Sequence, residues 1–209
     1  MDEEAVSISV PDGPTLEGKV RRLDAPKGGL VVCHPHPLYG GEMENPVVVR
    51  AVEVGWEQGL STLRFNFRGV GRSEGTHAAG VGERDDARAA IMHLAAWLPA
   101  EAPLGLAGYS FGASVAAAVP ATDPPVAALA LIAPPLGMVD VAAPVAPGRP
   151  TLVVAGTRDQ YCPVEALEAF ARRIPGARSA IIEGADHFFF GKLFPLGEAL
   201  AAWAREWAR

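Results

Sequence analysis

The stretch that decides the fold is Gly105-Leu106-Ala107-Gly108-Tyr109-Ser110-Phe111-Gly112-Ala113-Ser114. It begins with an apolar run, continues with a match to the pattern G-x-S-x-G at residues 108–112, and ends in small residues. This is the sequence expected where a strand turns sharply into a helix with a serine at the apex. Glycines suit such a turn because its apex is strained and the strand and helix approach closely. The pattern also occurs by chance, but the strand before it and the helix after it favour a nucleophile at Ser110.

Length and composition are those of one globular domain with a sizeable core. The chain has 209 residues, of which 49% are hydrophobic and 20% are charged. The net charge is -6 and no block of Lys and Arg occurs, so we expect no nucleic-acid partner. Residues 1–4 are acidic, unlike a signal peptide, and no apolar run approaches about 18 residues, so we expect a cytoplasmic protein without a membrane partner. Cys33 and Cys162 are too few for a disulfide framework.

Strand and helix patterns alternate from residue 29 to the end of the chain. The expected strands are Ala5–Val10, Leu16–Leu23, Gly29–Cys33, Leu60–Phe65, Leu104–Ala107, Val126–Ala133, Thr151–Ala155 and Arg178–Glu183. Helices are expected from Pro46, over Gly82–Leu98, after Ser110, from Pro163, and around Leu196–Trp207. The first two strands should pair as an antiparallel hairpin at one edge. We therefore predict a single α/β domain over residues 1–209, with a mainly parallel twisted sheet and helices on both faces.

Three residues with complementary chemistry each follow an expected strand: Ser110, Asp159 and His187. Ligands of such sheets bind at the carboxyl ends of the strands, so we expect the three side chains to meet there. A serine hydroxyl is a weak nucleophile until a base takes its proton, and His187 can be that base. Asp159 can accept a hydrogen bond from the other ring nitrogen and stabilise the imidazolium.

Each of these assignments has a rival. His187 could be an ordinary surface histidine, although the alternative base His93 lies within an expected helix. Asp140 could supply the acid from the irregular stretch before residue 150. Asp186 adjoins the histidine, and folding back onto the neighbouring imidazole would be awkward. The position after a strand favours Asp159.

The loop after the third strand reads His34-Pro35-His36-Pro37-Leu38-Tyr39-Gly40-Gly41. The two prolines have no N–H, so backbone donors in this loop come from its other residues. We expect the N–H of His36 and the N–H of Phe111, at the start of the following helix, to form an oxyanion hole. His34 and His36 could instead bind a metal, but a catalytic zinc needs three protein ligands and no third is evident. We expect no metal and no cofactor, and the two side chains could instead brace the loop.

These motifs together resemble the α/β-hydrolase superfamily over nearly the whole chain. The narrower resemblance, to small lidless bacterial serine hydrolases, is carried by residues 34–41, by Arg64-Phe65-Asn66-Phe67-Arg68-Gly69-Val70-Gly71-Arg72-Ser73, and by residues 108–112. It implies the triad Ser110, Asp159 and His187 and a carboxylesterase-like activity. Many members of the superfamily have aspartate where Asn66 stands. Turn chemistry and a structural salt bridge of Arg68 or Arg72 account for this loop without a catalytic role.

The segment Pro134–Pro150 is too short for the helical cap that larger relatives carry at this place. We therefore expect a site open to solvent. Candidate substrate-lining residues are Tyr39, Phe111, Leu136, Met138 and Phe188, for which ordinary packing is an equal alternative. The run of three phenylalanines at residues 188–190 could be an exposed apolar edge, but we interpret it as core. Cys33 is expected to be a buried small hydrophobe, and neither cysteine stands at the turn that carries Ser110.

The sequence thus predicts a serine hydrolase that acts on small or short-chain acyl esters. The same residues could serve a thioesterase, an amidase or an acyltransferase, because these reactions share their site chemistry. A binding module that keeps the fold without turnover is the alternative of another class, and the complete triad argues against it.

Overall fold

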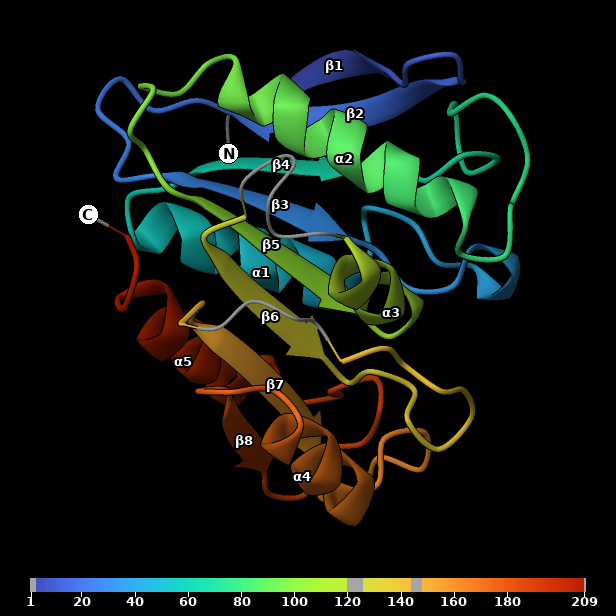
Figure 1. Ribbon diagram of the computed structural model, residues 1–209, viewed down its shortest axis with the longest axis vertical. Coiled ribbons are helices and arrows are strands. Elements are labelled where there is room, and N and C mark those ends of the chain that lie inside the picture. The colour runs from blue at the N-terminus through green and yellow to red at the C-terminus, as the bar shows by residue number, and fades with distance from the viewer. Residues whose placement is uncertain (1–2, 120–125, 144–147, 209) are drawn as a thin grey trace.

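The computed structural model describes residues 3–119, 126–143 and 148–208, so residues 144–147 of the Pro134–Pro150 segment lie outside it (Figure 1). The strands are β1 (Glu4–Ser9), β2 (Thr15–Arg21), β3 (Gly29–Cys33), β4 (Ser61–Phe65), β5 (Leu104–Tyr109), β6 (Ala128–Ile132), β7 (Thr151–Gly156) and β8 (Arg178–Ile182). The helices are α1 (Pro46–Glu57), α2 (Gly82–Ala95), α3 (Phe111–Ala118), α4 (Val164–Arg172) and α5 (Leu193–Ala204), with a short 3-10 helix, η1 (Pro37–Tyr39).

The described residues form one eight-stranded sheet in the order β1-β2-β4-β3-β5-β6-β7-β8. The first strand pairs antiparallel with β2, and β2 pairs antiparallel with β4, whereas all other neighbours are parallel. The predicted fold class is confirmed, including the N-terminal hairpin at the sheet edge. The central strands β3, β5, β6 and β7 are buried along their whole length because helices cover both of their faces.

Helices cover the two faces of the sheet unequally. Figure 1 shows α2, α3 and α4 on the face toward the viewer, with α1 and α5 behind the sheet. Alternate residues of each strand enter different cores: Val31 and Leu106 pack with the first set of helices, and Val32 and Ala107 with the second. The strands from β3 onward run parallel to one another, so their carboxyl ends lie at one edge of the molecule, on the right in Figure 1.

Several element boundaries differ from the sequence prediction by a few residues, and two of these differences have a clear physical cause. The strand before the turn extends through Tyr109, because β6 pairs with it as far as the match of Tyr109 with Ile132. The helix from Gly82 ends at Ala95, since residues 97 and 98 donate to carbonyls three residues back in tighter turns. Among the described residues, no helix combines the length and apolar character needed to cross a membrane.

Helix α5 and the turn that follows it are fixed to the sheet by two tryptophans, Trp203 and Trp207. A Cβ atom on Gly105, the second residue of β5, would lie 2.5 Å from the ring of Trp207 and 3.3 Å from that of Trp203. The glycine thus leaves the space that the rings fill. Trp203 is 2% exposed, and its indole N–H donates to the Pro150 carbonyl at 3.1 Å. The aromatic contact therefore joins the C-terminal helix to the centre of the sheet.

The substitution Trp203→Ala should lower the free energy of unfolding by about 3–5 kcal/mol, because it leaves a cavity between α5 and the sheet. Phe194→Ala is the matched control on the same helix, where the side chain is 72% exposed, and it should change stability by no more than about 0.5 kcal/mol. Urea denaturation of both variants measures the difference. Equal losses in the two variants would contradict this account of how α5 is held.

Candidate active site

Ser110 lies between β5 and α3 in a backbone conformation that few L-residues adopt. Its φ is 55° and its ψ is -115°. The glycines of the motif explain how the turn is possible: a Cβ atom on Gly108 would collide with the Gly112 carbonyl, and one on Gly112 would lie 2.5 Å from the carbonyl oxygens of Cys33 and His34. The Ser110 N–H donates to the Ile132 carbonyl at 2.8 Å, which ties the apex to β6.

The structure brings together Ser110, His187 and Asp159, from the loops after β5, β8 and β7. The distance from Ser110 Oγ to His187 Nε2 is 3.0 Å. On the other side of the ring, Nδ1 lies 3.0 Å from Oδ1 and 2.9 Å from Oδ2 of Asp159. An ionised carboxylate can only accept, so Nδ1–H donates to Asp159, and Nε2 is left to accept from the serine hydroxyl. This is the arrangement in which the imidazole can take the serine proton.

Asp159 is held for this task by the backbone that follows it. The side chain is buried, and its Oδ1 accepts from the N–H groups of Tyr161 and Cys162, each at 2.9 Å. The carboxylates of the two rival aspartates are engaged differently: Asp140 is exposed, and Asp186 accepts from the N–H groups of its own turn, at residues 188 and 190. Of the three candidates, Asp159 is the one whose carboxylate contacts the His187 imidazole.

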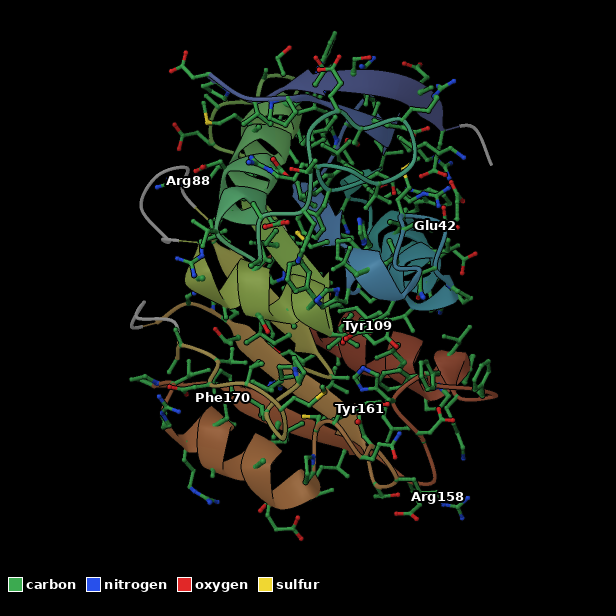
Figure 2. The ribbon with its side chains drawn as sticks, turned by 90° about the vertical axis from the view of Figure 1, so that its right-hand side faces the viewer. Glu42, Arg88, Tyr109, Arg158, Tyr161 and Phe170 are labelled. Atoms are coloured by element: carbon green, nitrogen blue, oxygen red, sulfur yellow. The ribbon has the colours of Figure 1, made fainter. Side chains whose placement is uncertain are left out.

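Two tyrosines that the sequence analysis did not single out fix His187. The hydroxyl of Tyr109 donates to the His187 carbonyl at 2.9 Å, and the ring of Tyr161 meets the imidazole edge-on with centroids 4.8 Å apart. Burial raises the pKa of Tyr109, which keeps its hydroxyl a donor. Figure 2 views the carboxyl-end edge face-on, with both tyrosines near its centre. The sequence offered a signal for Tyr109, which stands directly before Ser110 in the motif. Because successive residues of a strand point to opposite sides of the sheet, the Tyr109 side chain is expected to point away from that of Ser110.

The residues expected to form the oxyanion hole lie against each other. The rings of His36 and Phe111 have centroids 4.8 Å apart, and the carbonyls of Cys33 and His34 contact Gly112 at the start of α3. Within the described residues, neither the N–H of His36 nor that of Phe111 donates a hydrogen bond. Both donors are therefore available to an external acceptor.

His34 is a brace between two loops. It is buried; its Nδ1 donates to the Pro35 carbonyl at 2.6 Å, and its Nε2 accepts from the Phe67 N–H at 3.0 Å. Both ring nitrogens are thus engaged by backbone groups, which leaves neither to ligate a metal. Burial lowers the pKa of His34 to about 4, although the hydrogen bond to Pro35 acts in the opposite direction.

The loop after β4 is held by ion pairs rather than directed at the nucleophile. The Arg68 guanidinium contacts the fully buried carboxylate of Asp86 at 2.7 Å, and that contact raises the pKa of Arg68. Arg72 is exposed and lies 3.4 Å from Glu17. Asn66 is buried, accepting from the Met43 N–H and donating to Glu17. The predicted structural salt bridges of this loop are therefore present.

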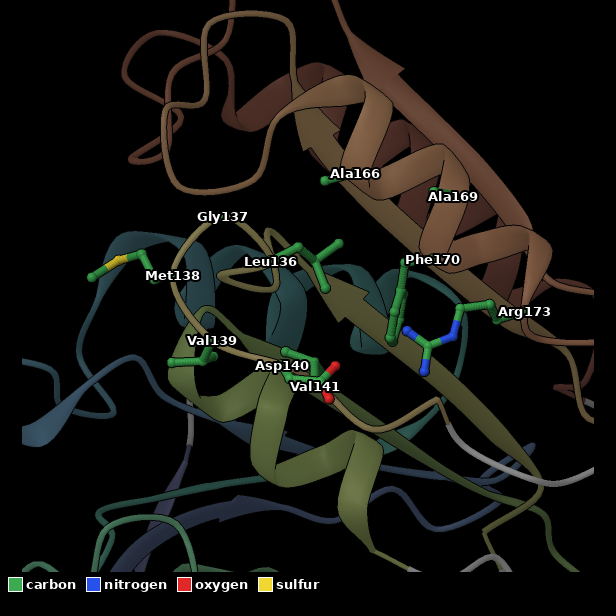
Figure 3. Close-up of a pocket in the computed structure, with 10 residues that line it drawn as sticks. All are labelled: Leu136, Gly137, Met138, Val139, Asp140, Val141, Ala166, Ala169, Phe170 and Arg173. Carbon is green, nitrogen blue, oxygen red and sulfur yellow. The ribbon is translucent and has the colours of Figure 1, made fainter.

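The residues proposed to line a substrate site lie in different surroundings. Tyr39 is 84% exposed, Met138 64% and Phe188 50%, whereas Phe111 is half-buried. Leu136 contributes to a cavity of about 450 Å³ between α4 and the segment after β6, where Figure 3 shows it facing α4 and Met138 turned away. The residues of the triad do not line that cavity.

The interpretation of residues 188–190 as core is wrong for two of the three phenylalanines. Phe189 is fully buried, but Phe188 is half exposed and Phe190 is 77% exposed. The cause is a tight turn around Asp186. Its carboxylate accepts hydrogen bonds from the N–H groups of residues 188 and 190, and its backbone carbonyl accepts one from the Phe189 N–H. Successive side chains of such a turn point in different directions, so one of them reaches the core.

Comparisons with known proteins agree on the kind of fold. No family model matches the chain. Its structure is similar to XC6422 from Xanthomonas campestris, a member of the α/β serine hydrolases without lid, with a TM-score of 0.89, 32% identity, and coverage of 100% of this chain and 96% of that chain. An α/β serine hydrolase homologue from Coxiella burnetii is 38% identical, with a TM-score of 0.83 and 97% of both chains covered. The uncharacterized protein RP471 of Rickettsia prowazekii is 32% identical over 200 residues, which are 91% of this chain and 84% of that protein.

The buried neutral imidazole of His34 should make the stability of the fold depend on pH. Its pKa is about 4 when folded and about 6.5 when unfolded, so the unfolded chain binds more protons between these values. The stabilisation is complete above about pH 6.5 and is lost as the pH falls toward 4, by about 2 kcal/mol at pH 5. Urea unfolding at pH 8 and pH 5 should therefore show a larger acid loss in the wild type than in His34→Gln. The same loss in both proteins would contradict this role of His34.

Proposed function

Because this chain belongs to the α/β serine hydrolases without a lid, we propose that it is a carboxylesterase that cleaves small or short-chain esters through an acyl-serine intermediate. The observation that carries the proposal is the continuous set of contacts from Ser110 Oγ through the His187 ring to the buried Asp159 carboxylate. Such a set serves proton transfer in nucleophilic catalysis. A module that only binds would have no use for it.

In the proposed first half-reaction, Ser110 Oγ attacks the ester carbonyl carbon while its proton passes to His187 Nε2. Asp159 stabilises the imidazolium that forms. The carbonyl oxygen becomes an oxyanion, which accepts from the free N–H groups of Phe111 and His36. When the tetrahedral intermediate collapses, the carbon–oxygen bond to the alcohol breaks and the alcohol leaves with the proton from His187.

In the second half-reaction, water replaces the alcohol. His187 removes a proton from the water as its oxygen attacks the acyl carbon, and the oxyanion forms again at the same two donors. Collapse of this intermediate breaks the bond to Ser110 Oγ, which regains its proton from the imidazolium. The products are the carboxylic acid and the free enzyme.

The surroundings of the triad support small, apolar acyl esters as substrates. In the described part of the connection between β6 and β7 no helix covers the site, in keeping with a lidless family. Tyr39, Met138 and Phe188 come from loops at the same sheet edge and expose apolar surface there. An open apolar edge can receive a short acyl group but offers few walls to select a long one.

Replacement of Ser110 by alanine should lower kcat for p-nitrophenyl acetate by up to about 10⁶-fold, because it removes the nucleophile of a unit whose members act together. A fluorophosphonate probe should label the wild type once and leave Ser110→Ala unlabelled, and intact-protein mass spectrometry measures both.

Ser114→Ala is the matched control, since Ser114 stands one turn later on α3 and makes no side-chain hydrogen bond to the described residues. This variant should keep both turnover and labelling. Equal hydrolysis by wild type and Ser110→Ala, or a folded wild type that resists the probe, would refute the proposal and favour a binding module.

A further inference from the structure

A buried carboxylate outside the triad holds the segment in front of α2. Glu83, in the first turn of that helix, has no exposed surface. Its Oε1 accepts from the Ala78 N–H and its Oε2 from the Gly80 N–H, each at 2.8 Å. The same Oε1 lies 2.8 Å from Nδ1 of His77. The Glu83 side chain therefore binds two N–H groups of the loop at residues 77–80, which we call the Glu83 loop, and lies against the His77 ring without a hydrogen bond to Nδ1.

The conformation of the Glu83 loop shows why it needs such an anchor. Ala79 has a φ of 50°, in the left-handed region that favours glycine, and Gly80 follows with a φ of 83°. A strained backbone of this kind persists only where its surroundings over-determine it. Two N–H groups bound to a buried carboxylate supply that constraint.

The Glu83 loop packs against His36 and Phe111, the two residues whose N–H groups would bind the oxyanion. The His77 ring lies with its centroid 5.0 Å from that of His36 and 5.5 Å from that of Phe111. These two rings are themselves 4.8 Å apart, so the three side chains pack as a triangle. A Cβ atom on Gly80 would contact the Phe111 ring at 3.6 Å, which brings the loop backbone to the same place.

We propose that Glu83 and His77 are positioning residues of the oxyanion site. Glu83 fixes the loop, and His77 packs against the side chains of His36 and Phe111 and so sets where their backbone N–H groups point. This inference rests on the proposed function, because it assigns a task within that reaction. Donors aimed at the oxyanion lose much of their effect when they are displaced by a fraction of an ångström, so the consequence should appear in transition-state stabilisation.

The variant Glu83→Gln tests the proposal. A glutamine keeps one acceptor but turns an NH₂ group toward the second loop N–H, and it removes the negative charge beside His77. We expect kcat for p-nitrophenyl acetate to fall about 10-fold with KM changed less than about 2-fold, a smaller loss than the 10²–10³ typical when a donor is deleted. The Ki of phenylboronic acid, which forms a tetrahedral adduct with the serine, should rise by the same factor as kcat/KM falls.

Titration with a fluorophosphonate separates positioning from folding, because it counts the competent serines. The kcat per titrated site should fall in Glu83→Gln and also in His77→Ala, which keeps the carboxylate and serves if the first variant does not fold. Asp85→Asn is the matched control: it removes an acidic charge from the same helical turn at a side chain that is 60% exposed, and it should leave kcat and Ki unchanged.

An unchanged kcat per titrated site, with an unchanged Ki for phenylboronic acid, would overturn the positioning role while leaving the esterase proposal intact. A loss of the same size in Asp85→Asn would overturn it too, because the effect would then come from charge alone. Failure of the proposed function is a different result, visible in the wild type as absent turnover and absent labelling, and it would remove the basis of this inference as well.

Discussion

The close approach of β5 and α3 at Ser110 is the constraint on which the rest of the structure depends. The two elements can meet only because glycines stand on either side of the serine, and the contact forces Ser110 to a φ of 55°. The strain is sustained by β6, which accepts the serine N–H, and by the loop after β3, whose carbonyls contact Gly112. This one local contact thus places the hydroxyl at the apex of the turn, next to the backbone N–H groups that we propose as oxyanion donors.

The parallel sheet brings the remaining residues of the candidate site together, because the loops at the carboxyl ends of its strands lie at one edge. The apolar strands give a rigid base, and the polar side chains needed to shape the loops are buried between them with their partners. His34 joins the loops after β3 and β4, Asp86 holds Arg68, and Asp159 caps the turn that follows β7. Each of these groups is hydrogen-bonded, which offsets the cost of burying it.

The sequence was informative where chemistry depends on chain order and uninformative where it depends on packing. Ser110, Asp159 and His187 could be named because each follows a strand, and parallel strands bring such positions together. Glu83 could not be named from the sequence, because its proposed positioning role depends on the direction in which its side chain points from α2 into the protein. The prediction that residues 188–190 are all core failed for a similar reason. Hydrophobicity predicts burial, but the geometry of a tight turn decides which of three neighbouring phenylalanines is buried.

The two histidine–carboxylate pairs at this edge differ in what lies beyond the ring. In both, a buried carboxylate oxygen is close to Nδ1: Asp159 beside His187, and Glu83 beside His77. Across the first ring, Nε2 meets the Ser110 hydroxyl, so a proton can be passed along the set. At the second ring, no described residue accepts from or donates to Nε2 of His77, and the rings of His36 and Phe111 pack against it at interplanar angles of 45° and 54°. The first ring is hydrogen-bonded on both sides, as the proposed proton transfer requires, whereas Nδ1 of His77 has no hydrogen-bond partner among the described residues. The surroundings of the second ring therefore fit the proposed positioning role, in which it acts by packing.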